Sequence, residues 1–564
     1  MTARIVETGR SRAVIDRPYS WLKDESNAAD EISEVHAGLI MPGKTVEDQS
    51  TSTSTHLPVG SRITIEHLWL AVPVFVFLCN SFRFPVPVLD FWWHLKIGEV
   101  IATTKSIPRV DIFSFTAAGQ TFVAQNWLAE LIFYWTYKVG GLPLIVFFTS
   151  VLSLTGFLLI YRLCLNATNK VRLCAFLGLL AALGNYSLSR PQAFSFTLFA
   201  AFYFVLARYK ERRQDLLCCL PVLMALWVNL HGAFVLGLGL IVLYIACEGC
   251  RRLIDPSRTD ALSFVEVRKL VIVLLACGAA TLLNPETYKV YDYVRTVVSN
   301  PASRKFVMEW QPPRINDLFS VLLFFAPLFV SLLAFIFGRV KPDLTETALF
   351  FAFGILGLMA IRNVGWFAAV AYPILARYLP LVDLSPLFPL RRFRGVDGYL
   401  GWMERSDIAP AGGHSRLNIV LVSVALLTLV LQSPWIRPAL NRTSLMDTET
   451  PVGAANFIEQ HRLTGHIYHP QVFGDYLIWR LWPQQKSFID GRVHLFSEDF
   501  CRQSLGLLDD SDWENVLNRW NIHYLLLNKV SADNATGNAI ASTRNSSRWT
   551  KLYEDDISIL FEKL

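Results

Sequence analysis

The segment LPLIVFFTSVLSLTGFLLIYRLCL, residues 142–165, decides the fold class of this chain. Apolar runs of about 17–25 residues are long enough to cross a bilayer as one helix. Comparable runs recur at 320–337 and 417–431, and 53% of the 564 residues are hydrophobic while only 17% are charged. A soluble domain usually carries about 25% charged residues. The sequence therefore predicts a mainly α-helical, polytopic membrane protein.

We predict about 11 membrane spans from the apolar segments of the sequence. They cover residues 64–82, 142–164, 171–187, 191–207, 215–230, 232–249, 268–284, 318–338, 345–361, 364–381 and 417–434. The stretch 127–138 is shorter than a span and rich in Trp and Tyr, which favours an interfacial helix. A twelfth span at this place, which would reverse the topology after it, stays open.

Lys and Arg residues concentrate in every second connection between these segments. The basic connections contain Lys170, Arg172, Arg208, Lys210, Arg212, Arg213, Arg251, Arg252, Arg339, Lys341, Arg391 and Arg392. Because basic loops stay in the cytoplasm, the N-terminus is predicted inside and the C-terminus outside. The outer connection at 285–317 departs from this pattern with basic residues of its own. The net charge of +6 therefore indicates topology and not a nucleic-acid partner.

The polar regions flank the membrane part. Residues 1–60 are polar and lack the apolar core of a signal peptide, which predicts a disordered cytoplasmic tail. Residues 61–435 form the multi-span part, with a long first outer loop at 83–141. Residues 436–564 are predicted to fold as a small α/β domain on the outer, periplasmic face. Strands are expected at 466–469, 486–489, 523–527 and in a hairpin at 552–561, and helices at 473–481 and 513–520.

The first outer loop opens with an acid, two indoles and an imidazole within five residues, Asp90 to His94. A carboxylate at a membrane edge can act as a general base or hold a metal ion that grips a phosphate. In a helix His94 would share a face with Asp90. The alternative is an aromatic belt, in which Trp92 and Trp93 sit among the headgroups and Asp90 is simply solvated.

Further polar residues interrupt the apolar pattern on the same predicted face. Arg362 breaks an apolar stretch, and a guanidinium is a fitting partner for a phosphate. The other candidates for substrate binding are Arg190 with Gln192, Asn229 with His231, and Glu309 beside Trp310. Taken singly, each is also explained as a helix cap, a snorkelling Arg or a solvated acid. Taken together with Asp90, they favour one shared polar pocket.

Other site chemistries find little support in the sequence. Most of the nine cysteines fall in apolar segments and show no metal-ligand spacing. The C-terminal region contains no nucleotide-binding loop and no G-x-S-x-G motif. Asp490 and Arg492, in FIDGR at 488–492, are most simply turn residues.

At these residues the chain resembles the GT-C superfamily, multi-span glycosyltransferases that use lipid-phosphate sugars, and more closely a large bacterial branch of it. The shared motifs are DFWWHLKIG at 90–98, IPRVDIFSFT at 107–116, NWLAE at 126–130, RPQ at 190–192, NLHG at 229–232, LNP at 283–285, EW at 309–310 and FIDGR at 488–492. The resemblance covers nearly all of the chain beyond residue 64.

The resemblance implies a bacterial inner-membrane protein whose first outer loop carries a catalytic acid, with an interfacial helix behind it. Asp90 matches the position of that acid. The superfamily often has two acids as a D-x-D or E-D pair, and this pair is absent here. A divalent metal, Mg or Mn, therefore stays open as a cofactor, and the second group stays open among His94, Asp111 and Glu130.

The resulting hypothesis is an inverting glycosyltransferase that moves a sugar from a polyprenyl-phosphate donor to a lipid-linked glycan, polysaccharide or protein acceptor. Asp90, with His94 as second catalytic candidate, would deprotonate the acceptor hydroxyl. Arg362 and Arg190 would neutralise the lipid phosphate, and Trp93 in the aromatic loop would bind the sugar. Membrane lipids are the other expected partners. Two alternatives remain, a transporter or flippase of lipid-linked glycans and a non-catalytic membrane assembly protein.

Overall fold

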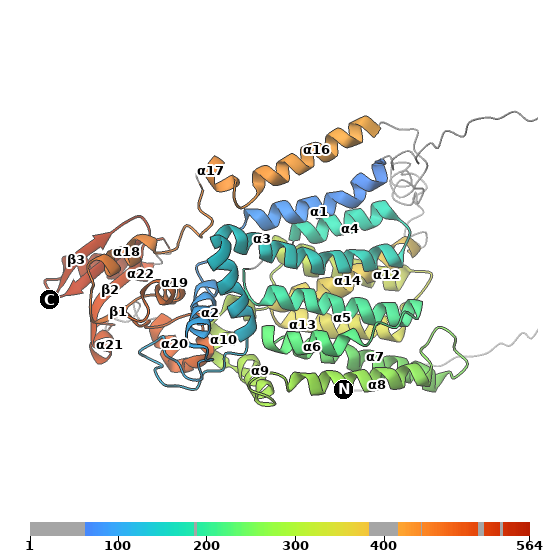
Figure 1. Ribbon diagram of the computed structural model, residues 1–564, viewed down its shortest axis with the longest axis horizontal. Helices are drawn as coiled ribbons and strands as arrows, with labels where there is room; N and C mark the ends of the chain where they lie inside the picture. The colour runs from blue at the N-terminus through green and yellow to red at the C-terminus, as the bar shows by residue number, and fades with distance from the viewer. Residues whose placement is uncertain (1–62, 185–188, 383–414, 442, 506–512, 531–533) are drawn as a thin grey trace, which may run out of the picture. The chain divides into compact units, whose positions relative to one another are not determined.

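The computed structural model describes residues 63–184, 189–382, 415–441, 443–505, 513–530 and 534–564. The predicted tail at 1–60 lies outside these ranges. Arg62–Leu564 forms one compact unit. Most of its described residues are helical, and the strands are confined to one small sheet near the C-terminus (Figure 1).

A bundle of helices makes up most of this unit. Its members are α1 (Ile65–Arg83), the second part of α3 (Trp127–Ala167), α4 (Val171–Gly184), α5 (Gln192–Arg212), α6 (Cys219–Leu230), α7 (Phe234–Ile254), α8 (Phe264–Thr281), α12 (Ala326–Phe337), α13 (Leu344–Met359), α14 (Val364–Tyr378) and α16 (Ser415–Gln432). Figure 1 shows these helices running alongside one another. Each predicted span coincides with one of them, so the positions of the apolar segments were predicted correctly as helices.

Five of the described helices are long and apolar enough to cross a membrane. They are Ile65–Arg83, Trp127–Ala167, Phe234–Ile254, Leu318–Phe337 and Ile361–Leu381. Others are apolar but shorter, such as α6 (Cys219–Leu230) with 12 residues. A helix of that length measures about 18 Å, less than the hydrocarbon core of about 30 Å. The chain is therefore a membrane protein, and the lengths alone support fewer spans than the sequence predicted.

Helix α3 is two helices joined at a sharp bend. Gly141 has φ 61° and ψ −158°, which is not helical, and Pro143 follows it. Only glycine adopts such a conformation readily. The bend separates residues 127–140 from the apolar part of the helix, and the ribbon changes direction there (Figure 1). A helix that lies along the membrane surface needs such a bend before the chain can turn into the membrane as a span.

Helix α2 (Phe91–Thr104) packs on the first part of α3, and both belong to the first outer loop at 83–141. The contact is close, because a Cβ on Gly98 of α2 would lie 2.1 Å from the Glu130 carbonyl oxygen. The second outer connection forms α9 (Lys289–Ser299), α10 (Pro301–Phe306) and the short helix η1 (Met308–Trp310). These segments and α2 surround the site described below.

The C-terminal part contains a four-stranded sheet in the order β1-β2-β4-β3. β1 (His466–Tyr468) pairs with β2 (Ile522–Asn528) in parallel, and β3 (Trp549–Glu554) and β4 (Ser558–Lys563) form the predicted hairpin. Helices α19 (Gln471–Leu481) and α21 (Trp513–Arg519) lie where helices were predicted. The expected strand at 486–489 is not part of the sheet. Ser487 instead forms an isolated bridge with Ser114 of the first outer loop.

A buried ion cluster also fastens the first outer loop to the C-terminal part. Arg492 is fully buried and donates to Asp490 from Nε (2.9 Å) and Nη2 (2.7 Å). Its Nη1 donates to Asp111 at 2.6 Å, across 381 positions of the chain. Both carboxylates are fully buried as well. Asp490 and Arg492, which the sequence presented as turn residues, thus hold two distant segments together.

Ion pairs tie the bundle helices together at their other ends. Lys210 of α5 lies 2.5 Å from Asp343, the N-cap of α13, and 3.3 Å from Glu248 of α7. Arg377 of α14 pairs with Glu346 of α13. These pairs lie at the ends that the sequence predicts to be cytoplasmic.

Candidate active site

One cavity, with a volume of about 1460 Å³, runs between the bundle helices and reaches the first outer loop and the C-terminal part. All of the predicted site residues except Asn229 line it. They are Asp90, Trp93, His94, Arg190, Gln192, His231, Glu309 and Arg362. These eight residues, which come from distant parts of the chain, thus line one pocket.

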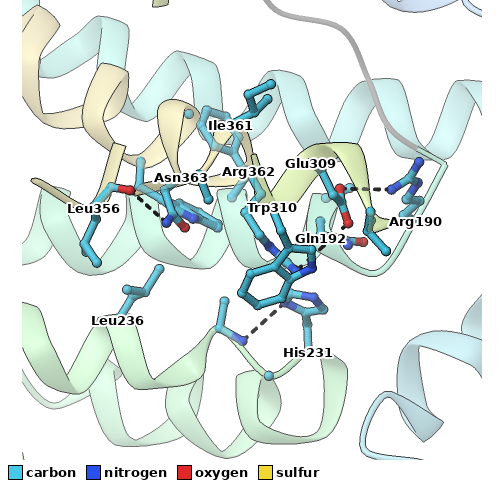
Figure 2. Close-up of a pocket in the computed structure, with 18 of the residues that line it drawn as sticks. Arg190, Gln192, His231, Leu236, Glu309, Trp310, Leu356, Ile361, Arg362 and Asn363 are labelled. Atoms are coloured by element: carbon cyan, nitrogen blue, oxygen red, sulfur yellow. Dashed lines mark hydrogen bonds and ion pairs between the residues drawn. The ribbon is translucent and has the colours of Figure 1, made fainter. Parts of the chain in front are cut away.

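Charged side chains form a chain of ion pairs along one wall of the cavity, part of which Figure 2 shows. Arg190 Nη1 lies 2.8 Å from Asp90 Oδ2 and 3.3 Å from Glu309 Oε2. Glu309 Oε1 is 4.0 Å from Arg362 Nη1. The Arg362 guanidinium lies over the Trp310 ring, 4.3 Å from its centroid. Two guanidinium groups within reach of one another offer a planar set of N–H donors that fits a phosphate.

Asp90 has an unusual backbone. Its φ is 67° and its ψ is −52°, and the Phe91 N–H donates to the Leu89 carbonyl at 2.9 Å, which closes a γ-turn around Asp90. Such a turn is rare and costs about 1–3 kcal/mol. An Asp at a helix N-cap normally caps its own helix, but Asp90 makes no side-chain bond to α2. Its carboxylate is directed to Arg190 instead.

Asp475 of α19 contacts the same turn. Its Oδ2 accepts the Asp90 N–H at 2.5 Å, and its Oδ1 accepts the Gly491 N–H at 2.7 Å. Asp475 is fully buried. A hydrogen bond of this kind stabilises by about 0.5–3 kcal/mol, which is comparable to the cost of the γ-turn.

The two acids differ in their electrostatic surroundings. Burial raises the pKa of Asp90 above its ordinary value and is the largest influence on it. Arg190 and Arg362 act against this rise, and Glu309 adds to it. Burial and the neighbouring Asp90 raise the pKa of Asp475 well above its ordinary range. Because Arg190 pairs with Asp90 and not with Asp475, Asp90 is the acid that ionises first.

His94 is buried against Glu130 of α3, with Nδ1 2.8 Å from Oε1. Burial lowers the pKa of His94 and raises that of Glu130. Both shifts favour the uncharged form. His94 and Glu130 are therefore both neutral at any pH between the lowered pKa of His94 and the raised pKa of Glu130. The Trp93 ring packs on the imidazole, with centroids 3.5 Å apart. Trp92 points into the core, where its Nε1 donates to the Pro87 carbonyl at 3.0 Å.

His231 presents a defined tautomer to the cavity. Its Nδ1 accepts the Ala233 N–H at 3.3 Å and lies 2.8 Å from the Ser195 hydroxyl. Ser195 in turn accepts from Trp227 Nε1 at 2.7 Å, so its own proton goes to His231. Burial and Arg362 lower the pKa of His231 to about 3. His231 is thus neutral and carries its proton on Nε2, available as a donor to a ligand.

Polar acceptor atoms also border the cavity. Among the described residues that line it, Gln125 Oε1, Asn126 Oδ1 and Gln192 Oε1 are buried without a hydrogen-bond partner. Gln125 donates from Nε2 to the Val228 carbonyl at 2.8 Å. This bond fixes the orientation of the amide, so the unpartnered atom is its oxygen, an acceptor. Such atoms fit a ligand with hydroxyl groups, since a hydroxyl can donate to them while a phosphate oxygen cannot.

Asn229 differs from the other candidates, because its side chain is used inside the protein. Its Oδ1 accepts from Trp127 Nε1 at 2.8 Å and from Asn284 Nδ2 at 3.3 Å, and its Nδ2 donates to the Ala225 carbonyl at 2.8 Å. Asn229 thus holds α6 against the start of α3. We withdraw it as a substrate-binding residue.

One part of the cavity is mainly apolar and extends along the bundle helices. Its lining includes Phe157, Ile160, Leu177, Leu236, Leu323 and Leu356. Lining residues on α3 run from Ser153 to Cys164, which are separated by about 17 Å along a helix. A molecule with a polar head and a long apolar tail fits a cavity that has a charged wall in one part and apolar walls in another.

The donor set does not fit a divalent metal ion. Within the described ranges, no three His, Cys, Asp or Glu side chains gather as ligands. Asp90 and Glu309 share Arg190 instead, and the oxygens of Asp475 accept backbone N–H groups. These residues therefore do not support Mg or Mn as a cofactor. The reaction proposed below does not use a metal ion.

Neither a protein-family model nor a curated protein matches this chain. Solved structures do resemble it. The oligosaccharyltransferase AglB from Archaeoglobus fulgidus, solved with an inhibitory peptide and a dolichol-phosphate, has a TM-score of 0.46 and 11% identity over 82% of this chain and 69% of its own.

Two further structures are similar to the same extent. ArnT from Cupriavidus metallidurans, bound to undecaprenyl phosphate, has a TM-score of 0.42 and 13% identity over 88% of this chain and 97% of its own. The arabinofuranosyltransferase AftD from Mycobacteria has a TM-score of 0.44 and 13% identity over 89% of this chain and 42% of its own. Since each TM-score is below 0.5, the likeness says nothing about the reaction of this chain.

Several residues of the site were not predicted from the sequence. Gln125 and Gly491 line the cavity, and Asp475 contacts Asp90 and Gly491 beside it. Their roles depend on contacts between distant parts of the chain. The available signals were the quoted motif FIDGR at 488–492, which contains Gly491, and the motif NWLAE at 126–130, which Gln125 precedes.

Proposed function

We propose that this protein is a membrane glycosyltransferase that transfers a sugar from a polyprenyl-phosphate donor. The observation that carries the proposal is the single cavity in which a wall of paired carboxylates and guanidinium groups adjoins a long apolar interior. The apolar interior suits the lipid tail, and Arg190 and Arg362 suit the phosphate. The unpartnered oxygens of Gln125 and Gln192 suit sugar hydroxyls.

The reaction follows from this placement. Asp90 accepts the proton of the acceptor hydroxyl, whose oxygen forms a bond to the anomeric carbon of the sugar. The bond from that carbon to the phosphate oxygen breaks, and polyprenyl phosphate leaves with its electron pair. Arg190 and Arg362 stabilise the charge that develops on the leaving phosphate. Attack opposite to the leaving group inverts the anomeric configuration. The acceptor is a lipid-linked glycan, a polysaccharide or a protein.

The arrangement favours an enzyme over a transporter or flippase. On α5 the cavity is lined by Gln192, Ala193 and Phe196, near the start of the helix. The ion pair of Lys210 with Asp343 lies near its other end and does not line the cavity. A flippase must open its binding site to both sides of the membrane, whereas these ion pairs keep the opposite ends of the helices together.

The proposed topology follows the sequence prediction. The shorter apolar helices cross the bacterial inner membrane together with the five long ones, so the chain spans it about 11 times. The N-terminus is then cytoplasmic, and the site and residues 436–564 lie on the periplasmic side. The ion pairs between α5, α7, α13 and α14 fall on the cytoplasmic side, where basic residues are retained.

Arg362→Ala is expected to raise the KM for the lipid donor by about 10- to 100-fold, as loss of a charge-assisted hydrogen bond predicts. Arg362→Lys keeps the charge and loses the planar fork, so its KM should lie between those of the wild type and Arg362→Ala. The measurement is sugar transfer in membranes at varied concentrations of labelled polyprenyl-phosphate sugar. An unchanged KM in Arg362→Ala would contradict the phosphate-binding role.

The pH dependence of transfer should show the raised pKa of Asp90. A base works only when ionised, so the rate rises with pH through a pKa above the ordinary range of an aspartate. The charged groups that face Asp90 are Arg190, Arg362 and Glu309, with Asp475 behind it. Removing the negative Glu309 lowers the pKa of Asp90, so Glu309→Gln should move the acid limb of the profile to lower pH. A shift to higher pH would be inconsistent with Asp90 as the base.

A further inference from the structure

Asp475 reaches the site from the C-terminal part of the chain, 385 positions away from Asp90. It lies on α19, which packs against α2 through an edge-to-face contact of Tyr476 with Trp92, with centroids 5.1 Å apart. Both of its oxygens accept backbone N–H groups, one from Asp90 and one from Gly491. A carboxyl group in this position fixes the course of both backbones.

Gly491 completes the contact because it has no side chain. A Cβ at this position would lie 2.7 Å from Asp475 Oδ2 and 2.8 Å from Asp90 Oδ1. These distances are too short for real contacts, and an Asp side chain has little freedom to withdraw. The Gly491 backbone therefore lies directly beside the Asp90 carboxylate, which also forms an ion pair with Arg190 at 2.8 Å.

The turn at Asp90 depends on partners from outside its own helix. α2 receives no side-chain cap from Asp90, and the γ-turn is an unfavourable local conformation. Val86, ahead of the turn, is also held by the C-terminal part, since its N–H donates to Leu445 (2.7 Å) and its carbonyl accepts from Asp447 (3.0 Å). The segment from Val86 to Asp90 is thus shaped by residues that follow the bundle in the sequence.

We propose that Asp475 is a positioning residue that, with Gly491, holds Asp90 in its γ-turn and so directs the Asp90 carboxylate into the cavity. The C-terminal part is then a component of the catalytic site and not only a docking surface for partners. This inference depends on the proposed function for its kinetic consequences, but the clamp itself can be measured without an activity assay.

Hydrogen exchange tests the clamp directly in the full-length protein in detergent or nanodiscs. Asp475→Ala should speed exchange in peptides that cover residues 84–92 by about tenfold, as loss of one ordinary hydrogen bond predicts. Glu459→Gln is the matched control. Glu459 pairs at the surface with Arg480, which lies on α19 as Asp475 does. The control should leave exchange at 84–92 unchanged. Equal exchange in Asp475→Ala and the wild type would overturn the proposal.

Kinetics test the consequence for the reaction. Asp475→Asn keeps the shape but places an amide donor against one of the two N–H groups, so kcat should fall while the KM for the lipid donor stays constant. Gly491→Ala should act in the same direction. A displacement of about 1 Å can cost about 100-fold in rate, and we expect a loss of this size. A thermal unfolding curve close to that of the wild type separates this effect from loss of the fold.

The outcomes distinguish the two proposals. If Asp90→Asn is inactive while Asp475→Asn and Gly491→Ala match the wild type, the positioning role fails and the proposed function stands. If Asp90→Asn is itself as active as the wild type, the proposed function fails. A rise in KM with kcat unchanged in Asp475→Asn would likewise contradict a positioning role.

Discussion

Asp90→Asn is expected to lower the rate of sugar transfer about 1000-fold, within the usual range for loss of a general base. The substitution keeps the size of the side chain and removes its capacity to take a proton. Asn can still accept a hydrogen bond from Arg190, which lies 2.8 Å from Asp90 Oδ2. The KM for the lipid donor should therefore change little, because the residues that bind the phosphate are intact.

The measurement is transfer of labelled sugar from a polyprenyl phosphate in membranes that contain equal amounts of each variant. Asp499→Asn serves as the control, because Asp499 is an exposed acid of the C-terminal part and does not line the cavity. Wild-type rates in Asp90→Asn would remove Asp90 from the reaction.

Arg492→Met is expected to destabilise the protein by about 3–5 kcal/mol, the usual result of removing one partner from a buried ion cluster. The substitution leaves Asp111 and Asp490, both fully buried, without their shared cation. The penalty is larger than for a surface pair, because neither carboxylate can regain water. The first outer loop should detach from the C-terminal part, and transfer should fall with it.

Thermal unfolding in detergent is the direct measurement of this effect. Arg480→Met removes an exposed pair with Glu459 and should cost only about 0–1 kcal/mol. Similar melting temperatures for Arg492→Met and Arg480→Met would show that the buried cluster does not join the two segments.

The apolar pattern of the sequence predicted where the bundle helices lie, because burial in a membrane requires long uninterrupted runs. It did not give the number of spans, since helices such as α6 are shorter than the apolar segments around them suggested. The strand expected at 486–489 failed for another reason. Its backbone bridges to the first outer loop at Ser114 and Ser487, while its apolar residues Phe488 and Ile489 still pack against the C-terminal sheet.

Most of the candidate site was accessible from sequence because charged residues are conspicuous in apolar surroundings. Arg190 and Arg362 are examples, and both line the cavity. Asn229 shows the limit of this reasoning, since a polar residue beside a helix end can equally satisfy its neighbours. Asp475 shows the opposite limit. A single acid within a helix of the C-terminal part carries no local sign of its contact with Asp90.

The central claim is that the charged wall binds the phosphate of a polyprenyl lipid beside Asp90. An experimental structure of the protein in nanodiscs with polyprenyl phosphate would test it most directly. We predict density for the phosphate within hydrogen-bonding distance of Arg190 and Arg362, with the lipid tail along Phe157 and Leu236 in the bundle cavity. A lipid phosphate bound elsewhere, with its tail outside this cavity, would contradict the claim.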